Sequence, residues 1–187
     1  MMTSRLSGNP IFTIGHSTRS ITEFVALLRR SEIEMVVDVR IMPRSRTNPQ
    51  YNREALSASL ADAGIGYEHI AALGGLRGRN RDVAPAVNDF WENDSFHNFA
   101  DYAMGDAFRD GFTRLRQLAR GQRCAVMCSE AVWWRCHRRI IADYLIHAGD
   151  AVFHIIGAER IEPARMTPSA KPDADDVLTY RAGARAP

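Results

Sequence analysis

The densest group of chemically versatile side chains lies between residues 128 and 138. Cys128 and Glu130 stand two residues apart, and Cys136, His137 and Arg138 form an unbroken run. A thiolate is the reactive form of cysteine, and helix amides or cationic neighbours depress the thiol pKa. We therefore take Cys128 as a candidate nucleophile, with Glu130 or His137 supplying the acid or base. The alternative is that Cys128 and Cys136 are small core residues, because free cysteine is among the most buried residue types.

Spacing counts against two familiar cysteine chemistries. The segment from Cys128 to Arg135 is longer than the phosphate loop of protein tyrosine phosphatases, and it contains no glycine. A zinc site on Cys128, Cys136 and His137 lacks the close cysteine pairs of structural zinc motifs and would need His16 as a fourth ligand. We assign no metal ligand on this basis, and the cofactor stays unknown.

Five short apolar runs predict the strands that must position these residues. They are residues 11–14, 35–39, 67–70, 124–128 and 151–156. Between them, hydrophobic residues recur at helical spacing, which predicts parallel strands joined by right-handed crossovers. We expect a three-layer, doubly wound α/β fold with a mostly parallel five-stranded sheet in the order 3-2-1-4-5.

The 187 residues, 45% of them hydrophobic, suit one domain with a sizeable core. We expect residues 1–10 to form a flexible N-terminus and residues 11–157 to form a single α/β domain. Residues 158–187 are rich in proline and alanine, so we expect a loosely packed C-terminal tail.

Polar residues gather after four of the five predicted strands, where ligands of such sheets bind. Three of these groups contain arginine clusters. Codon bias explains how many arginines the chain has, but not why they cluster, and guanidinium groups bind phosphate in a bidentate way. The catalytic candidates are Cys128, Glu130, His16 and Asp38, and the substrate-binding candidates are Arg40, Ser45, Arg46, Gly74, Gly75, Arg77, Cys136, His137 and Arg138.

Two of these candidates carry expectations about geometry. Strands one and four should flank the switch point of the sheet, so His16 should lie next to the Cys128–Glu130 segment. Asp38 interrupts an apolar strand, and a buried carboxylate needs a partner. We expect an arginine such as Arg40, or a histidine, to bind Asp38, the alternative being a general base or metal ligand.

Together the motifs resemble the bacterial and archaeal family known only as domain of unknown function 488. The matching pieces are Thr13–Ser17, Val37–Arg40, Pro43 with Ser45–Arg46, Leu73–Gly75, Met127–Cys128 with Glu130, and Cys136–Arg138. The resemblance runs from about Ile11 to Ile156 and implies a compact α/β fold with a shared polar site, but no settled reaction. Family members often carry an Asp-Pro stretch where this chain has residues 131–135, which leaves the capping of the next helix open.

Three functions remain in view. The first is an enzyme, a transferase or hydrolase, acting on a phosphate-bearing small molecule or nucleotide. The second is a non-catalytic module that binds a nucleotide or nucleic acid by stacking bases on Trp91, Trp133 or Trp134. The third is a metal-assisted hydrolase, with His16, Asp38, Glu130 and His137 around the metal.

The remaining features point to a cytoplasmic protein of ordinary charge. The formal net charge is only +2, too small for bulk attraction to nucleic acid. No run approaches the roughly 18 apolar residues of a membrane helix, and the polar Met1–Pro10 does not read as a signal peptide. Three neighbouring cysteines favour a reduced compartment over a disulfide framework. The oligomeric state stays unknown.

Overall fold

A six-stranded sheet forms the centre of the protein in the computed structural model, which describes residues 8–183. The strands are β1 (Ile11–Gly15), β2 (Met35–Asp38), β3 (Gly66–His69), β4 (Cys124–Cys128), β5 (Val152–Gly157) and β6 (Arg160–Pro163). The helices are α1 (Ile21–Arg30), α2 (Arg53–Asp62), α3 (Asp94–Ala103), α4 (Asp106–Gly121) and α5 (Arg138–His147). Short 3-10 helices cover Pro49–Tyr51, Ala71–Leu73, Pro85–Val87 and Trp133–Arg135, and a separate hairpin pairs β7 (Ala170–Pro172) with β8 (Leu178–Tyr180).

The α/β fold class is confirmed, with one change in the order of the strands. The sheet runs β3-β2-β4-β1-β5-β6, so β4 lies between β2 and β1, and β6 adds an antiparallel edge. The expected order 3-2-1-4-5 differs from the observed one in that it placed β1, rather than β4, next to β2. Both β1 and β4 are buried on both faces, so their hydrophobic pattern is satisfied in either position.

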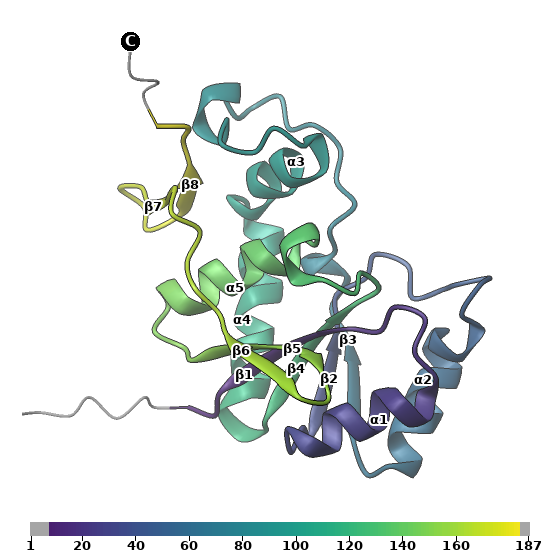
Figure 1. The fold of residues 1–187 in the computed structure, drawn as a ribbon. Coiled ribbons are helices and arrows are strands. Elements are labelled where there is room, and N and C mark those ends of the chain that lie inside the picture. The colour runs from purple at the N-terminus through teal and green to yellow at the C-terminus, as the bar shows by residue number, and fades with distance from the viewer. Residues whose placement is uncertain (1–7, 184–187) are drawn as a thin grey trace, which may run out of the picture.

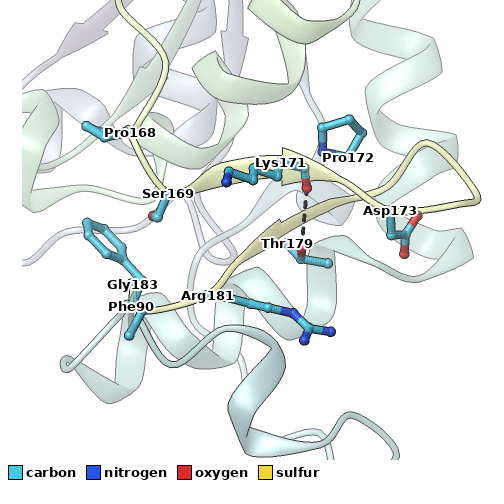
Figure 2. Close-up of a pocket in the computed structure, with 10 residues that line it drawn as sticks. Phe90, Pro168, Ser169, Lys171, Pro172, Asp173, Thr179, Arg181 and Gly183 are labelled. Carbon is cyan, nitrogen blue, oxygen red and sulfur yellow. Dashed lines mark hydrogen bonds between the residues drawn. The ribbon is translucent and has the colours of Figure 1, made fainter. Parts of the chain in front are cut away.

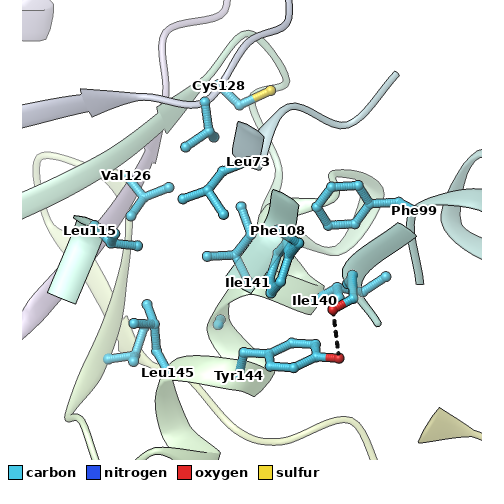
Figure 3. Packing of buried hydrophobic residues seen from close by; sticks show 14 of the residues in the cluster. Leu73, Phe99, Phe108, Leu115, Val126, Cys128, Ile140, Ile141, Tyr144 and Leu145 are labelled. Atoms are coloured by element: carbon cyan, nitrogen blue, oxygen red, sulfur yellow. Dashed lines mark hydrogen bonds between the residues drawn. The ribbon is translucent and has the colours of Figure 1, made fainter. Parts of the chain in front are cut away.

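The sheet is the middle of three layers. Helices α1 and α2 cover one face, while α4 and α5 cover the other (Figure 1). Side chains alternate between these layers along each strand. Met127 packs in the cluster under α1 and α2, whereas Cys128 belongs to the cluster under α4 and α5, near Val126 and Leu73 (Figure 3). The cysteine at the end of β4 therefore faces α5.

Helix α1 satisfies its own first turn. The Ser20 side chain accepts a hydrogen bond from the Glu23 backbone N–H, and the Glu23 carboxylate accepts one from the Ser20 backbone N–H. Phe24, Leu27 and Leu28 bury the opposite face of the helix. This capping box occupies two of the backbone donors at the start of α1 and places the Glu23 carboxylate there.

The C-terminal segment, residues 158–183, packs more tightly than its composition suggested. Strand β6 completes the sheet, and Leu178 and Tyr180 are fully buried in the larger core cluster. The Asp143 carboxylate of α5 accepts hydrogen bonds from the Tyr180 hydroxyl (3.1 Å) and the Thr167 backbone N–H (2.8 Å). The proline- and alanine-rich composition of the segment did not predict this packing, because two buried side chains, Leu178 and Tyr180, are enough to hold the segment against the core. The expected flexibility of residues 1–7 and the end of the tail, 184–187, concerns chain outside the described residues.

Asp143 should make stability depend on pH. Burial raises its pKa to about 6 from an ordinary 3.8, partly offset by the hydrogen bonds from Thr167 and Tyr180. A raised acid pKa gives stability that is complete below the unfolded pKa and is lost as pH rises through the folded pKa. From about pH 4 to about pH 7, the wild-type free energy of unfolding should fall relative to that of Asp143→Asn by up to about 3 kcal/mol. Urea unfolding at each pH measures this difference, and a constant difference would contradict the assignment.

Candidate functional site

The ends of β1 and β4 touch because glycine occupies the contact. The backbone N–H of His16 donates to the Cys128 carbonyl (2.9 Å), and that of Ser17 donates to the Ser129 carbonyl (3.0 Å). A side-chain carbon at Gly15 would collide with the carbonyl oxygen of Glu130. The predicted juxtaposition of His16 with the Cys128–Glu130 segment is therefore confirmed.

A first cavity of about 460 Å³ opens at the carboxyl ends of β1, β2 and β4. Its lining residues are His16, Ser17, Thr18, Arg40, Met42, Arg44, Ser45, Asn48, Ser129, Glu130 and Ala131. Ser17 has φ 50°, a left-handed backbone conformation that costs a non-glycine residue roughly 1–3 kcal/mol. Such strain is concentrated at functional sites, which agrees with this wall of the cavity being a binding surface.

A buried ion pair supports the floor of the first cavity. Asp38 is 0% exposed, and Arg40 donates to both its oxygens, from Nε (2.9 Å) and Nη2 (2.6 Å). The Tyr67 hydroxyl adds a third hydrogen bond to Asp38 (2.7 Å), while burial and the carboxylate raise the pKa of Tyr67. The expected arginine partner of Asp38 is confirmed. Because its oxygens face Arg40 and Tyr67, Asp38 lines neither cavity and its role is to hold Arg40 in place.

His16 is held as a neutral imidazole. Its Nδ1 lies 2.8 Å from the Ser17 carbonyl oxygen, so this nitrogen carries the proton and Nε2 carries the lone pair. Arg40 Nη1 lies 3.4 Å from Nε2, and the ring stacks on Tyr51 at 4.0 Å. Burial lowers the pKa of His16 to about 4. The free lone pair therefore faces a guanidinium rather than the cavity centre, which limits His16 as a general base.

A second, smaller cavity of about 160 Å³ lies on the α5 side of β4. It is lined by Gly75, Ser95, Phe96, Cys128, Glu130, Arg135, Cys136 and His137. Glu130 lines both cavities and its side chain is exposed. The loop from β4 to α5 therefore forms the wall between them.

Of the two cysteines in the second cavity, Cys136 is the one whose thiol pKa is lowered. Burial raises its pKa, but a hydrogen bond from Cys128 and the charge and N–H groups of Arg138 outweigh burial and bring the pKa to about 6. The hydrogen bond to Cys136, together with burial, raises the pKa of Cys128 to about 12. The sequence indicated Cys128 as the candidate nucleophile, and the structure adds that Arg138 approaches the sulfur of Cys136. Both cysteines also belong to the core, as the alternative expected.

His137 points a lone pair at the two sulfurs. Its Nε2 lies 3.2 Å from the Val39 carbonyl oxygen, so Nε2 donates and Nδ1 is unprotonated in the neutral ring. Nδ1 lies 3.6 Å from Cys136 Sγ and 4.0 Å from Cys128 Sγ. A side-chain carbon at Gly75 would collide with this ring, so glycine makes room for it.

Several expected binding residues lie elsewhere. Arg77 donates to the carbonyls of Gly74 (2.8 Å) and Ala71 (2.7 Å) and stacks on Tyr102 at 3.7 Å, so its guanidinium faces the protein. Gly74, Arg46, Arg77 and Arg138 line neither cavity, whereas Arg40, Ser45, Gly75, Cys136 and His137 do. The candidate list omitted Ser17, Thr18, Arg44, Asn48 and Ser129. Ser17, Thr18 and Ser129 directly follow β1 and β4, and Arg44 and Asn48 lie in the loop after β2, so their place after predicted strands could have identified them.

The model of one protein family matches the chain over residues 20–145, and its description is domain of unknown function DUF488. The chain belongs to this DUF488 family. The resemblance noted from the motifs is thereby confirmed, and the match includes Asp38 and the Cys128–Arg138 segment, while His16 precedes it. Among curated proteins and solved structures, nothing matches. Of the helices within residues 8–183, none has the length and apolar character needed to cross a membrane.

Removal of the Asp38 carboxylate should be costly. Asp38→Ala leaves Arg40 buried without its counter-ion, so the free energy of unfolding should fall by about 3–5 kcal/mol. Glu159→Ala is the matched control, because Glu159 pairs with Arg30 at 3.1 Å on the exposed surface, and it should cost less than about 1 kcal/mol. Urea unfolding of both variants tests this, and equal small losses would refute the structural role of the buried pair.

Proposed function

We propose that this DUF488 protein is an enzyme acting on a phosphate-bearing small molecule in the first cavity. The observation that carries the proposal is the cationic and hydroxyl-rich lining of a cavity at the carboxyl ends of three parallel strands. Its volume of about 460 Å³ is in the range of small-molecule sites.

Arg44 is the cation that remains free for an anion. Arg40 also lines the first cavity, but Asp38 neutralises it. Arg44 is exposed and forms no ion pair within residues 8–183. Nearby hydroxyl donors come from Ser17, Thr18, Ser45 and Ser129. A charged donor flanked by neutral donors suits a phosphate group, which accepts several hydrogen bonds at once.

Glu130 sets the orientation of the substrate. A carboxylate repels phosphate, so the phosphate binds at the Arg44 side and the reacting group extends towards Glu130. An exposed carboxylate at the junction of two cavities is suited to take a proton from a water or an acceptor hydroxyl. This gives a hydrolase or a transferase with Glu130 as general base.

A non-catalytic nucleotide-binding module is the second candidate. Trp134 is 43% exposed and offers a face on which a base could stack. The other two tryptophans offer less: Trp91 is buried in the core, and Trp133 stacks on His154 at 4.4 Å. Of the three tryptophans, only Trp134 is therefore placed to stack on a base. An assay for substrate turnover distinguishes the enzyme from the non-catalytic module.

Phosphate should stabilise the protein through Arg44. At ten times its dissociation constant, phosphate should add about 1.4 kcal/mol and raise Tm by roughly 3–6 °C, beyond the effect of sodium chloride at equal ionic strength. Arg44→Gln should remove most of this rise, whereas Arg79→Gln should not, because Arg79 is exposed and lines neither cavity. A thermal shift that is the same for both salts, or for both variants, would exclude a phosphate site at Arg44.

Glu130→Gln should separate binding from catalysis. Turnover of a panel of sugar phosphates and nucleoside monophosphates, followed by phosphorus NMR, should fall by about 10²–10⁴-fold in this variant. The Tm rise with phosphate should persist or grow, since the variant removes a repelling charge. Turnover at the parental rate would refute Glu130 as general base, and phosphate binding without any turnover by the parent would favour the non-catalytic module.

A further inference from the structure

We propose that Cys128, Cys136 and His137 bind a zinc ion whose fourth coordination position opens into the second cavity. The three donor atoms, two Sγ and one Nδ1, all lie within 4.8 Å of one another. None of these three residues lines the first cavity, although Glu130 lines both cavities. The tests below measure binding of the metal alone, so either proposal can fail without the other.

The distances between the donor atoms match a tetrahedral zinc ion. Zinc bonds of about 2.3 Å to sulfur and about 2.0–2.1 Å to nitrogen place sulfur and nitrogen ligands about 3.6 Å apart. His137 Nδ1 lies 3.6 Å from Cys136 Sγ and 4.0 Å from Cys128 Sγ. The nitrogen-to-sulfur distances are thus within about half an ångström of those around a zinc ion, and the two sulfurs lie within 4.8 Å of each other.

The orientation of His137 is the one that zinc ligands adopt. Metal-bound histidines usually donate their second ring N–H to a carbonyl or carboxylate, which fixes the tautomer and the ring. Here Nε2 faces the Val39 carbonyl oxygen at 3.2 Å, so the lone pair of Nδ1 faces the sulfurs. Gly75 leaves the space for this ring position.

Arg138 stabilises Cys136 as a thiolate ligand by a hydrogen bond, as the Val39 carbonyl orients His137. Its Nε donates to Cys136 Sγ (3.3 Å) and its Nη2 to the Glu130 carbonyl (2.6 Å). Arg138 is buried and meets no carboxylate in the part of the chain that the structure describes. Two thiolates and one imidazole are soft donors that select zinc over magnesium or calcium.

The fourth position of this zinc ion would face solvent space rather than protein. The three donor residues line the second cavity, whose roughly 160 Å³ has room for water. His16, the fourth ligand considered from the sequence, lines the first cavity instead. Three protein ligands with a water in the fourth position are typical of catalytic rather than structural zinc. Glu130 lines the same cavity, where it can accept a proton from that water.

Metal binding by variants that each lack one proposed ligand tests the ligand set. Wild-type protein purified without chelator should contain about one zinc ion per chain, and cobalt substitution should give sulfur-to-cobalt charge-transfer absorption. Cys136→Ser and His137→Gln should weaken zinc binding by more than about 100-fold, beyond the loss expected for an outer partner. Cys124→Ser is the matched control, because Cys124 lies at the other end of β4, and it should bind zinc as the wild type does.

Wild-type protein gives a test that no folding defect can obscure. X-ray absorption at the zinc edge should show two sulfur atoms at about 2.3 Å and nitrogen or oxygen at about 2.0–2.2 Å. A wild type that binds no zinc, or binds it without sulfur, would overturn the proposal and leave a metal-free thiolate–imidazole pair.

Glycine variants test the geometry without touching a ligand. Gly75→Ala should displace His137 and weaken zinc binding by about 10–100-fold, as loss of an outer partner does. Gly78→Ala should have no effect, because a side-chain carbon there meets nothing within 4 Å. Equal zinc affinity in both glycine variants would show that His137 is not a ligand.

Discussion

A buried guanidinium fixes the loop that separates the two cavities. Arg138 is 1% exposed and reaches back from the start of α5 to the Cys136 sulfur and the Glu130 carbonyl. A buried charge without a carboxylate partner must be stabilised by whatever acceptors surround it. Here these acceptors are one sulfur and one carbonyl oxygen, so Arg138 ties the Cys136 side chain and the backbone of Glu130 to the start of α5.

The two cavities depend on that loop in different ways. The Glu130 carbonyl fits against Gly15, which joins the loop to β1 and shapes the wall of the first cavity. On the other side of the wall, Cys136 and His137 face β4 and Val39. The Asp38–Arg40 pair performs a similar task at the end of β2. Two buried arginines, Arg40 and Arg138, therefore hold the loops that follow β2 and β4.

Sequence reasoning succeeded where one strong physical rule decides the outcome. Parallel strands bring their carboxyl ends to one edge, so His16 had to approach Cys128 if β1 and β4 were neighbours. A buried carboxylate in an apolar strand requires a cationic partner, and Asp38 pairs with Arg40. The order of β1 and β4 within the sheet could not be predicted from the hydrophobic pattern, because both strands are buried on both faces.

Side-chain direction was beyond the reach of the sequence. Arg77 and Arg138 stand in similar arginine clusters, yet Arg77 stacks on Tyr102 and Arg138 is buried beside Cys136. Choices of this kind depend on partners that lie far away in the chain. For the same reason, Tyr180 in an apparently loose segment proved to be core, because its partners Asp143 and Asn88 come from two other regions.

The place of β1 in the sheet has a consequence for how the chain folds. Both neighbours of β1, the strands β4 and β5, begin more than a hundred residues later in the chain. Closing such long loops costs entropy before any strand contact forms, and sheets with distant pairings fold slowly. During synthesis, the apolar residues 11–15 therefore remain without a sheet partner until β4 has been made. During this interval both edges of that segment stay unpaired, which is the condition under which strands aggregate.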